Sequence, residues 1–176
     1  ICTSPRTRFG LRPKILAWHN KQKANNIRLA KDAALSVLSN IDINDKHTIE
    51  LALSFLYLGE GAKNNDASMG NSNPSVLKFF VNCLDILYNI KRTQLKCVLH
   101  LRQDQNEKIL KKYWSRELNI PLKNFYKTNF DKRTIKSKTY PHYKGVCIVY
   151  GAGIAVQRRL VFLSTEFCDK IVPKDP

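Results

Sequence analysis

The chain has 176 residues, a length that suits one domain or one domain with a short appendage. Its 30 Lys and Arg outnumber 14 Asp and Glu, so the formal net charge is +16 at pH 7. A charge of this size requires an acidic partner, of which nucleic acid is the commonest and an anionic membrane surface is the other candidate. No apolar run approaches the roughly 20 residues that span a bilayer, and the first residues hold no apolar signal-peptide core. We therefore expect a nucleic-acid partner and no membrane.

The five cysteines are odd in number and widely spaced, and no CxxC pair occurs among them. This pattern predicts free thiols in a reducing, intracellular compartment, namely the cytoplasm. The four histidines are scattered without metal-ligand spacing, which argues against a zinc site. These residues are Cys2, Cys83, Cys97, Cys147 and Cys168, and His19, His47, His100 and His142.

Residues 1–47 are polar and basic, and we predict that they form a basic, helical N-terminal extension or linker to a domain of residues 48–176. Apolar residues recur at loosely helical spacing from Ala24 to Leu38, which predicts an amphipathic helix. The stretch before this helix contains Pro5 and Pro13 and is predicted to be irregular.

Thr48 is placed to cap a helix over residues 49–59, which reads IELALSFLYLG and is apolar on almost every side. A helix of that kind must be buried all round, by its own domain or by a partner. It ends in Gly59-Glu60-Gly61, where we expect Gly61 to take a positive φ and give a sharp exit. Because a carboxylate opposes the dipole at a helix C-terminus, the position of Glu60 predicts a compensating cation such as Mg²⁺.

From residue 60 onward strands alternate with helices, a pattern typical of an α+β or α/β domain, and we assign the α+β class. The strand at 94–102 alternates an apolar face with a polar face that carries Lys96, His100 and Arg102. The elements predicted in chain order are a strand at 68–71, a helix at 75–89 opened by Pro74, the strand at 94–102, a helix at 105–118 capped by Asp104, a strand at 125–128, a basic loop at 129–143, a strand at 145–150 and a helix at 154–171 ended by Pro173.

Residues 123–144 combine many Lys and Arg side chains with three tyrosines against one acid, Asp131. Side chains at this density neutralise phosphates, whereas a charge run by itself is also typical of a solvated, flexible loop. Because the positive charge extends through the whole chain, we favour contact with DNA. The predicted DNA-binding residues are Lys63, Lys96, His100, Arg102, Lys127, Lys132, Arg133, Lys136, Lys138 and Lys144.

Gly151-Ala152-Gly153 lies between a predicted strand and a predicted helix, as the loop of a dinucleotide-binding fold does. The third glycine and the downstream acid of that fingerprint are missing, so we expect a plain turn and no nucleotide cofactor. Cys147, in the apolar strand before the turn, is expected to be a core residue rather than a nucleophile.

The apolar helix that ends in Gly59-Glu60-Gly61 resembles the LAGLIDADG motif of the homing endonucleases. The resemblance covers about residues 48–171, including Asn71-Ser72-Asn73-Pro74 and Tyr143-Lys144-Gly145, and is to a single-motif bacterial subgroup. It implies that two motif helices pack side by side and that each contributes one acid to a metal site over the scissile phosphates. Because this chain has one motif, the second helix would come from a homodimer.

The resemblance also implies roles for particular residues. Glu60 would bind Mg²⁺ with the help of backbone carbonyls near Gly59, and Lys144 would be the basic catalytic residue near the phosphates. Phe55 departs from the family, many of whose members have a small residue there. The helix contact between protomers would involve Ala52, Phe55, Leu56 and Gly59.

Together these inferences predict a Mg²⁺-dependent, site-specific endonuclease that hydrolyses phosphodiester bonds of double-stranded DNA as a homodimer. A non-cleaving DNA-binding regulator on the same scaffold is the alternative. An RNA-binding cofactor of intron splicing is a third possibility, since some members of the family act in that way.

Overall fold

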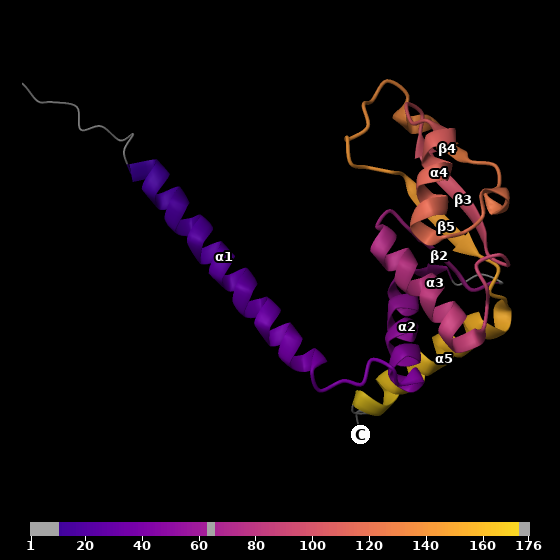
Figure 1. The fold of residues 1–176 in the computed structure, drawn as a ribbon, viewed down its shortest axis with the longest axis horizontal. Helices are drawn as coiled ribbons and strands as arrows, with labels where there is room; N and C mark the ends of the chain where they lie inside the picture. Colours follow the sequence, from indigo (N-terminus) through magenta and orange to yellow (C-terminus); the bar gives the residue numbers. More distant parts are fainter. Residues whose placement is uncertain (1–10, 63–65, 173–176) are drawn as a thin grey trace, which may run out of the picture. The chain divides into compact units, whose positions relative to one another are not determined.

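The computed structural model describes residues 11–62 and 66–172 (Figure 1). The chain divides into two units, residues 1–43 and 44–176. Predictions that involve other parts of the chain cannot be compared with the structure, and they concern Cys2, Pro5, Lys63 and Pro173, which lie outside the described residues.

The first unit contains the helix α1 (Leu11–Leu38), which has 28 residues and is longer than predicted. The prediction of an irregular stretch is wrong from Leu11 onward, because Pro13 falls in the first turn of the helix, where a missing N–H breaks no hydrogen bond. Within this unit the apolar side chains from Ile15 to Leu38 are exposed, so α1 buries no core of its own.

The second unit is a mixed α+β domain, as predicted (Figure 1). Its five-stranded sheet has the order β1-β2-β5-β3-β4, and all neighbours are antiparallel except the parallel pair β3 and β4. The strands are β1 (Gly61–Ala62), β2 (Ser68–Asn71), β3 (Lys96–Arg102), β4 (Asn129–Asp131) and β5 (Val146–Tyr150). The helices are α2 (Lys46–Glu60), α3 (Pro74–Tyr88), α4 (Glu107–Leu118) and α5 (Ile154–Ile171), with short 3-10 helices η1 (Leu122–Asn124) and η2 (Lys132–Thr134).

One face of the sheet is buried and the other is open. On β3 the side chains of Cys97, Leu99 and Leu101 are buried, whereas Lys96 and His100 are exposed, which confirms the predicted alternation. Figure 1 shows α3 and α4 on the same side of the sheet. The open face therefore carries the polar side chains of β3.

The core joins the sheet to the helices through large apolar side chains such as Tyr57, Phe80 and Trp114. The cysteines of this core are free and buried, and burial raises the pKa of the Cys83 thiol to about 11. A hydrogen bond with Cys97 is the main cause that raises the pKa of the Cys147 thiol, and burial raises it further. A protonated thiol is a poor nucleophile, so Cys147 is a core residue as expected.

The structure corrects two predicted helix caps. Asp45, rather than Thr48, caps α2, because the carboxylate of Asp45 accepts the backbone N–H groups of His47 and Thr48. The helix therefore begins within the second unit, which starts at residue 44. Asn106, rather than Asp104, caps α4 by accepting the N–H of Ile109.

The structure also corrects the order of elements after α4. The strand predicted at 125–128 is reduced to a single bridge between Phe125 and Cys97, directly after the 3-10 helix η1, and residues 126–128 form no strand. The following strand, β4, lies instead inside the segment predicted as a loop, because it pairs in parallel with the end of β3.

Candidate nucleic-acid interface

Glu60 is the last residue of α2 and its side chain is exposed. Its carboxylate accepts a hydrogen bond of 3.0 Å from the amide nitrogen of Asn71, at the end of β2. The amide oxygen of Asn71 accepts the backbone N–H of Asn73 at 2.8 Å, which orients the Asn71 side chain. The carboxylate is thereby held at the end of β2 while it remains exposed.

The two glycines beside Glu60 have different roles. The predicted positive φ of Gly61 is wrong, because φ is −77° and ψ is 144°. A side chain is excluded there by packing instead, since a Cβ on Gly61 would lie 2.5 Å from the ring and the carbonyl oxygen of Tyr57. For Gly59 a Cβ would meet nothing within 4 Å among the described atoms, so nothing in the fold of one protomer calls for glycine there.

An open stripe runs along α2. Ala52, Phe55 and Gly59 are exposed and Leu56 is half-buried, whereas Leu53, Ser54 and Tyr57 are buried against the core. These exposed residues are three and four positions apart and so lie on one side of the helix. The prediction that α2 is buried all round is therefore wrong for a single protomer. The ring of Phe55 packs edge-on against Phe167 of α5, with centroids 5.5 Å apart.

The open face of β3 brings together the predicted DNA-binding residues of that strand. The Lys96 ammonium lies 5.7 Å from the centroid of the Tyr126 ring. His100 Nε2 and the amide nitrogen of Asn129 are 3.0 Å apart, and Arg102 donates to the hydroxyl of Ser137. The side chains of Lys96 and His100 remain exposed, whereas Arg102 is half-buried.

The basic segment after β4 is anchored to the domain, in contrast to a loose loop. The backbone N–H of Thr139 donates to Asp104 at 2.7 Å, and the hydroxyl of Thr134 accepts the N–H of Gln103 at 3.0 Å. Arg133 forms an ion pair with Asp131, and this guanidinium lowers the pKa of the Asp131 carboxyl. The side chains exposed along the segment are Lys132, Arg133, Lys136 and Lys138, and Lys127 is exposed just before β4.

Lys144 lies away from direct contact with Glu60. Its ammonium is 6.0 Å from the ring centroid of Tyr113 and donates to the carbonyl of Pro141 at 3.4 Å. Its backbone carbonyl accepts the indole N–H of Trp114 at 2.9 Å. Within the region that the structure describes, no hydrogen bond or ion pair joins Lys144 to Glu60.

Among the described residues, Glu60 belongs to no cluster of metal-ligating side chains. Across residues 11–62 and 66–172, no group of three or more His, Cys, Asp or Glu side chains is placed to hold a metal ion. Mg²⁺ in proteins commonly takes one or two carboxylates together with waters and substrate phosphates. The Glu60 carboxylate and the carbonyls of the α2 C-terminus supply oxygen donors of this kind, and the remaining ligands would have to come from water, from substrate phosphates or from a second copy of the chain.

Glu50 is an important acid that the sequence analysis did not single out. Its side chain is 7% exposed, and it accepts hydrogen bonds from Arg159 at 2.5 and 2.8 Å and from the Tyr88 hydroxyl at 2.7 Å. The hydrogen bond from Arg159 lowers the pKa of Glu50. Burial is the main cause that raises the pKa of Tyr88, and its hydrogen bond to Glu50 raises it further. A charged residue within an apolar helix signals such a partner, although sequence alone does not say which cation supplies it.

Asp66 is a second acid that the sequence analysis did not single out. Its carboxylate accepts the backbone N–H groups of Gly151 and Gly153 at 2.7 and 2.5 Å. Both glycines have positive φ, which turns their amides toward the carboxylate. The Gly151–Gly153 turn thus binds an anion supplied by the chain itself.

Comparison with known protein families, curated proteins and solved structures finds no match to this chain. None of the described helices combines the length and the apolarity needed to cross a membrane.

Proposed function

We infer that the chain binds double-stranded DNA on the open face of its sheet and acts as a homodimeric, site-specific endonuclease with a LAGLIDADG-like core. The exposed cations on the open face of the sheet carry the DNA-binding part of this proposal, since Lys96 of β3 and the lysines of the basic segment are exposed. Asn71, which holds Glu60, pairs with Cys147, and Cys147 pairs with Leu99. Glu60 is therefore bonded to the end of β2, two strand spacings, or about 10 Å, from β3.

The homodimer is supported by the open stripe on α2. An exposed helix face with an unhindered glycine allows a second helix to approach closely. A twofold axis along this stripe would bring two Glu60 carboxylates together beside the DNA backbone. It would also give the target site two related halves.

Each group has a distinct role in the proposed reaction. Mg²⁺ held between two Glu60 carboxylates would supply Lewis-acid assistance to phosphodiester hydrolysis. Asn71 orients the carboxylate by donating to it, and the cations on β3 and in the basic segment hold the DNA by neutralising phosphates.

Cleavage is tested with a randomised duplex library incubated with Mg²⁺, followed by sequencing of the cut ends. The wild-type protein is expected to give ends at related sites, and Glu60→Gln is expected to give none. Glu166→Gln, which alters an exposed acid on α5, is the matched control and should cut as the wild type does. A Glu60→Gln protein that still nicks DNA contradicts the proposal.

A non-cleaving regulator is the second candidate, and the separation of Lys144 from Glu60 favours it. This candidate predicts salt-dependent binding without Mg²⁺-dependent ends. Under either candidate, Lys96→Ala should lower the slope of log affinity against log salt by about 0.9. Lys170→Ala, near the end of α5, should leave the slope unchanged. Equal slopes for both variants and the wild type would exclude β3 as the DNA-contacting strand.

A further inference from the structure

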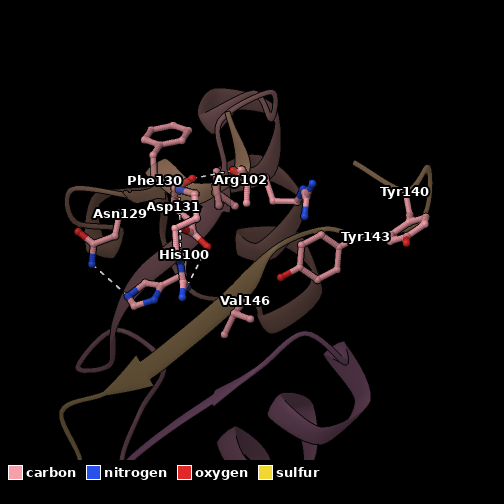
Figure 2. Close-up of a pocket in the computed structure, with 11 residues that line it drawn as sticks. His100, Arg102, Asn129, Phe130, Asp131, Tyr140, Tyr143 and Val146 are labelled. Carbon is pink, nitrogen blue, oxygen red and sulfur yellow. Dashed lines mark hydrogen bonds and ion pairs between the residues drawn. The ribbon is translucent and has the colours of Figure 1, made fainter. Parts of the chain in front are cut away.

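A cavity of about 560 Å³ opens beside the end of β3 (Figure 2). Residues from β3, β4, η2 and the start of β5 line it together with two tyrosines of the loop that precedes β5. The lining residues that matter for binding are His100, Arg102, Asn129, Arg133, Tyr140 and Tyr143.

The lining groups face one another across the cavity. In Figure 2 the rings of Tyr140 and Tyr143 lie on one side and the His100–Asn129 pair lies on the other. The Arg102 side chain extends between them in this view. The cavity thus combines aromatic rings on one wall with hydrogen-bonding groups on the opposite wall.

The tyrosine wall is held in place from outside the cavity. Gln105 donates from its side-chain amide to the carbonyl of Tyr143 at 2.8 Å. Thr139 donates from its backbone to Asp104 at 2.7 Å. Both anchors lie in the turn between β3 and α4, so the aromatic wall is organised before any ligand arrives, which lowers the entropy lost on binding.

Arg102 is incompletely satisfied. Its Nη2 donates to the Ser137 hydroxyl, whereas its buried Nε finds no hydrogen-bond acceptor within the part of the chain that the structure describes. An unsatisfied donor costs about 1–3 kcal/mol, so rotation of this side chain toward an added acceptor is favoured. Arg133, by contrast, is already paired with Asp131.

These features match one class of ligand. Aromatic rings bind the face of a nucleobase, amide and imidazole groups bind its edge, and a guanidinium binds phosphate. Inorganic phosphate would leave the tyrosines unused, and a paired base within a duplex could not enter a cavity of this size. The lining holds two guanidinium groups against one carboxylate, which favours an anionic ligand.

We propose that this cavity binds a single unpaired nucleotide, with its base against Tyr140 and Tyr143 and its phosphate at Arg102. The nucleotide comes either from the DNA, extruded from the stack, or from solution as a mononucleotide. The first source rests on the proposed DNA-binding function, and the second does not. Extrusion costs least where a base is already unpaired, so a bulged nucleotide is the best probe.

The duplex arm of the test compares two labelled hairpins by fluorescence anisotropy at one salt concentration. One hairpin carries a single-nucleotide adenine bulge and the other an abasic bulge. The wild-type protein should bind the adenine bulge more tightly by about tenfold, within the range of base–aromatic stacking. Tyr143→Ala should abolish this preference. Tyr140→Ala should reduce it, and because Tyr140 is 79% exposed this variant leaves the fold undisturbed.

Phe162→Ala is the matched control, since Phe162 is an exposed aromatic residue of α5 that does not line the cavity. It should keep the full preference for the adenine bulge. A preference that survives both Tyr140→Ala and Tyr143→Ala would overturn the assignment to this cavity.

The mononucleotide arm titrates AMP into the isotopically labelled full chain and follows the NMR signals of Arg102 and Tyr143. Saturable shifts that Tyr143→Ala removes support the cavity as a nucleotide site, even if no duplex binds and the proposed function fails. Duplex binding without adenine-bulge preference and without AMP shifts overturns the cavity proposal and leaves the proposed function intact.

Discussion

The two ends of α2 carry the same type of residue in opposite settings. Glu50, near the start of the helix, is buried and fully engaged by Arg159 and Tyr88. Glu60, at the end, is exposed and is oriented by one amide, that of Asn71. A buried acid with several partners stabilises the fold, whereas an exposed acid held at the edge of a surface remains able to bind a ligand.

The largest expected effect is a difference in protein stability between variants of Glu50 and Glu60. Glu50→Ala removes the acceptor of two donors and should lower the free energy of unfolding by about 2–4 kcal/mol, toward the lower end because Arg159 is largely exposed. Glu60→Ala should change it by less than about 0.5 kcal/mol. Urea unfolding followed by circular dichroism measures both, and equal losses would remove the distinction.

A smaller effect concerns the two glycines at the end of the helix. Gly61→Ala places a methyl group against Tyr57 and should lower the free energy of unfolding by about 1–3 kcal/mol. Gly59→Ala meets no neighbour in the protomer and improves helix propensity, so it should raise the free energy of unfolding of the monomer by about 0.5–1 kcal/mol. Thermal unfolding at low protein concentration measures both changes in the free energy of unfolding. A decrease for Gly59→Ala would contradict the presence of an open stripe on α2.

The smallest effect is a pH dependence at the Glu50 end. Arg159 lowers the pKa of Glu50 from its usual 4.5, so the stability from this pair is fully present above pH 4.5 and is lost as pH falls through the lower, folded-state pKa. The difference in urea midpoint between the wild type and Glu50→Gln should therefore shrink below pH 4.5. A difference that grows under acid would reverse the assigned sign.

The regular parts of this fold could be predicted because their patterns repeat locally. The alternation of β3 follows from a period of two residues, and the bounds of α5 follow from the glycine turn before it and Pro173 after it. The caps of α2 and α4 were assigned to the wrong residue because two suitable residues lie near the start of each helix, Asp45 and Thr48 for α2 and Asp104 and Asn106 for α4. β4 has only three residues, and it is a strand because it pairs with β3. Its own residues show no alternating pattern from which the strand could be predicted.

The positions of the charged residues in the candidate site could be predicted from the sequence, whereas most of the contacts between them could not. The cations on β3 and the exposure of the following lysines follow from the sequence pattern. The partner of Glu60 and the cavity could not be predicted, because each joins segments that are adjacent only through the sheet register. The predicted association of Lys144 with Glu60 stays a prediction for the DNA-bound dimer.

The central claim is that α2 helices of two protomers meet along their open stripe and bring two Glu60 carboxylates together. Sedimentation velocity over a range of concentrations, with and without duplex DNA, tests it most directly. We expect a species of twice the 20.3 kDa chain mass, and Gly59→Ala should reduce the fraction of the protein in that species. A strict monomer in both conditions would leave each Glu60 alone and would contradict the account.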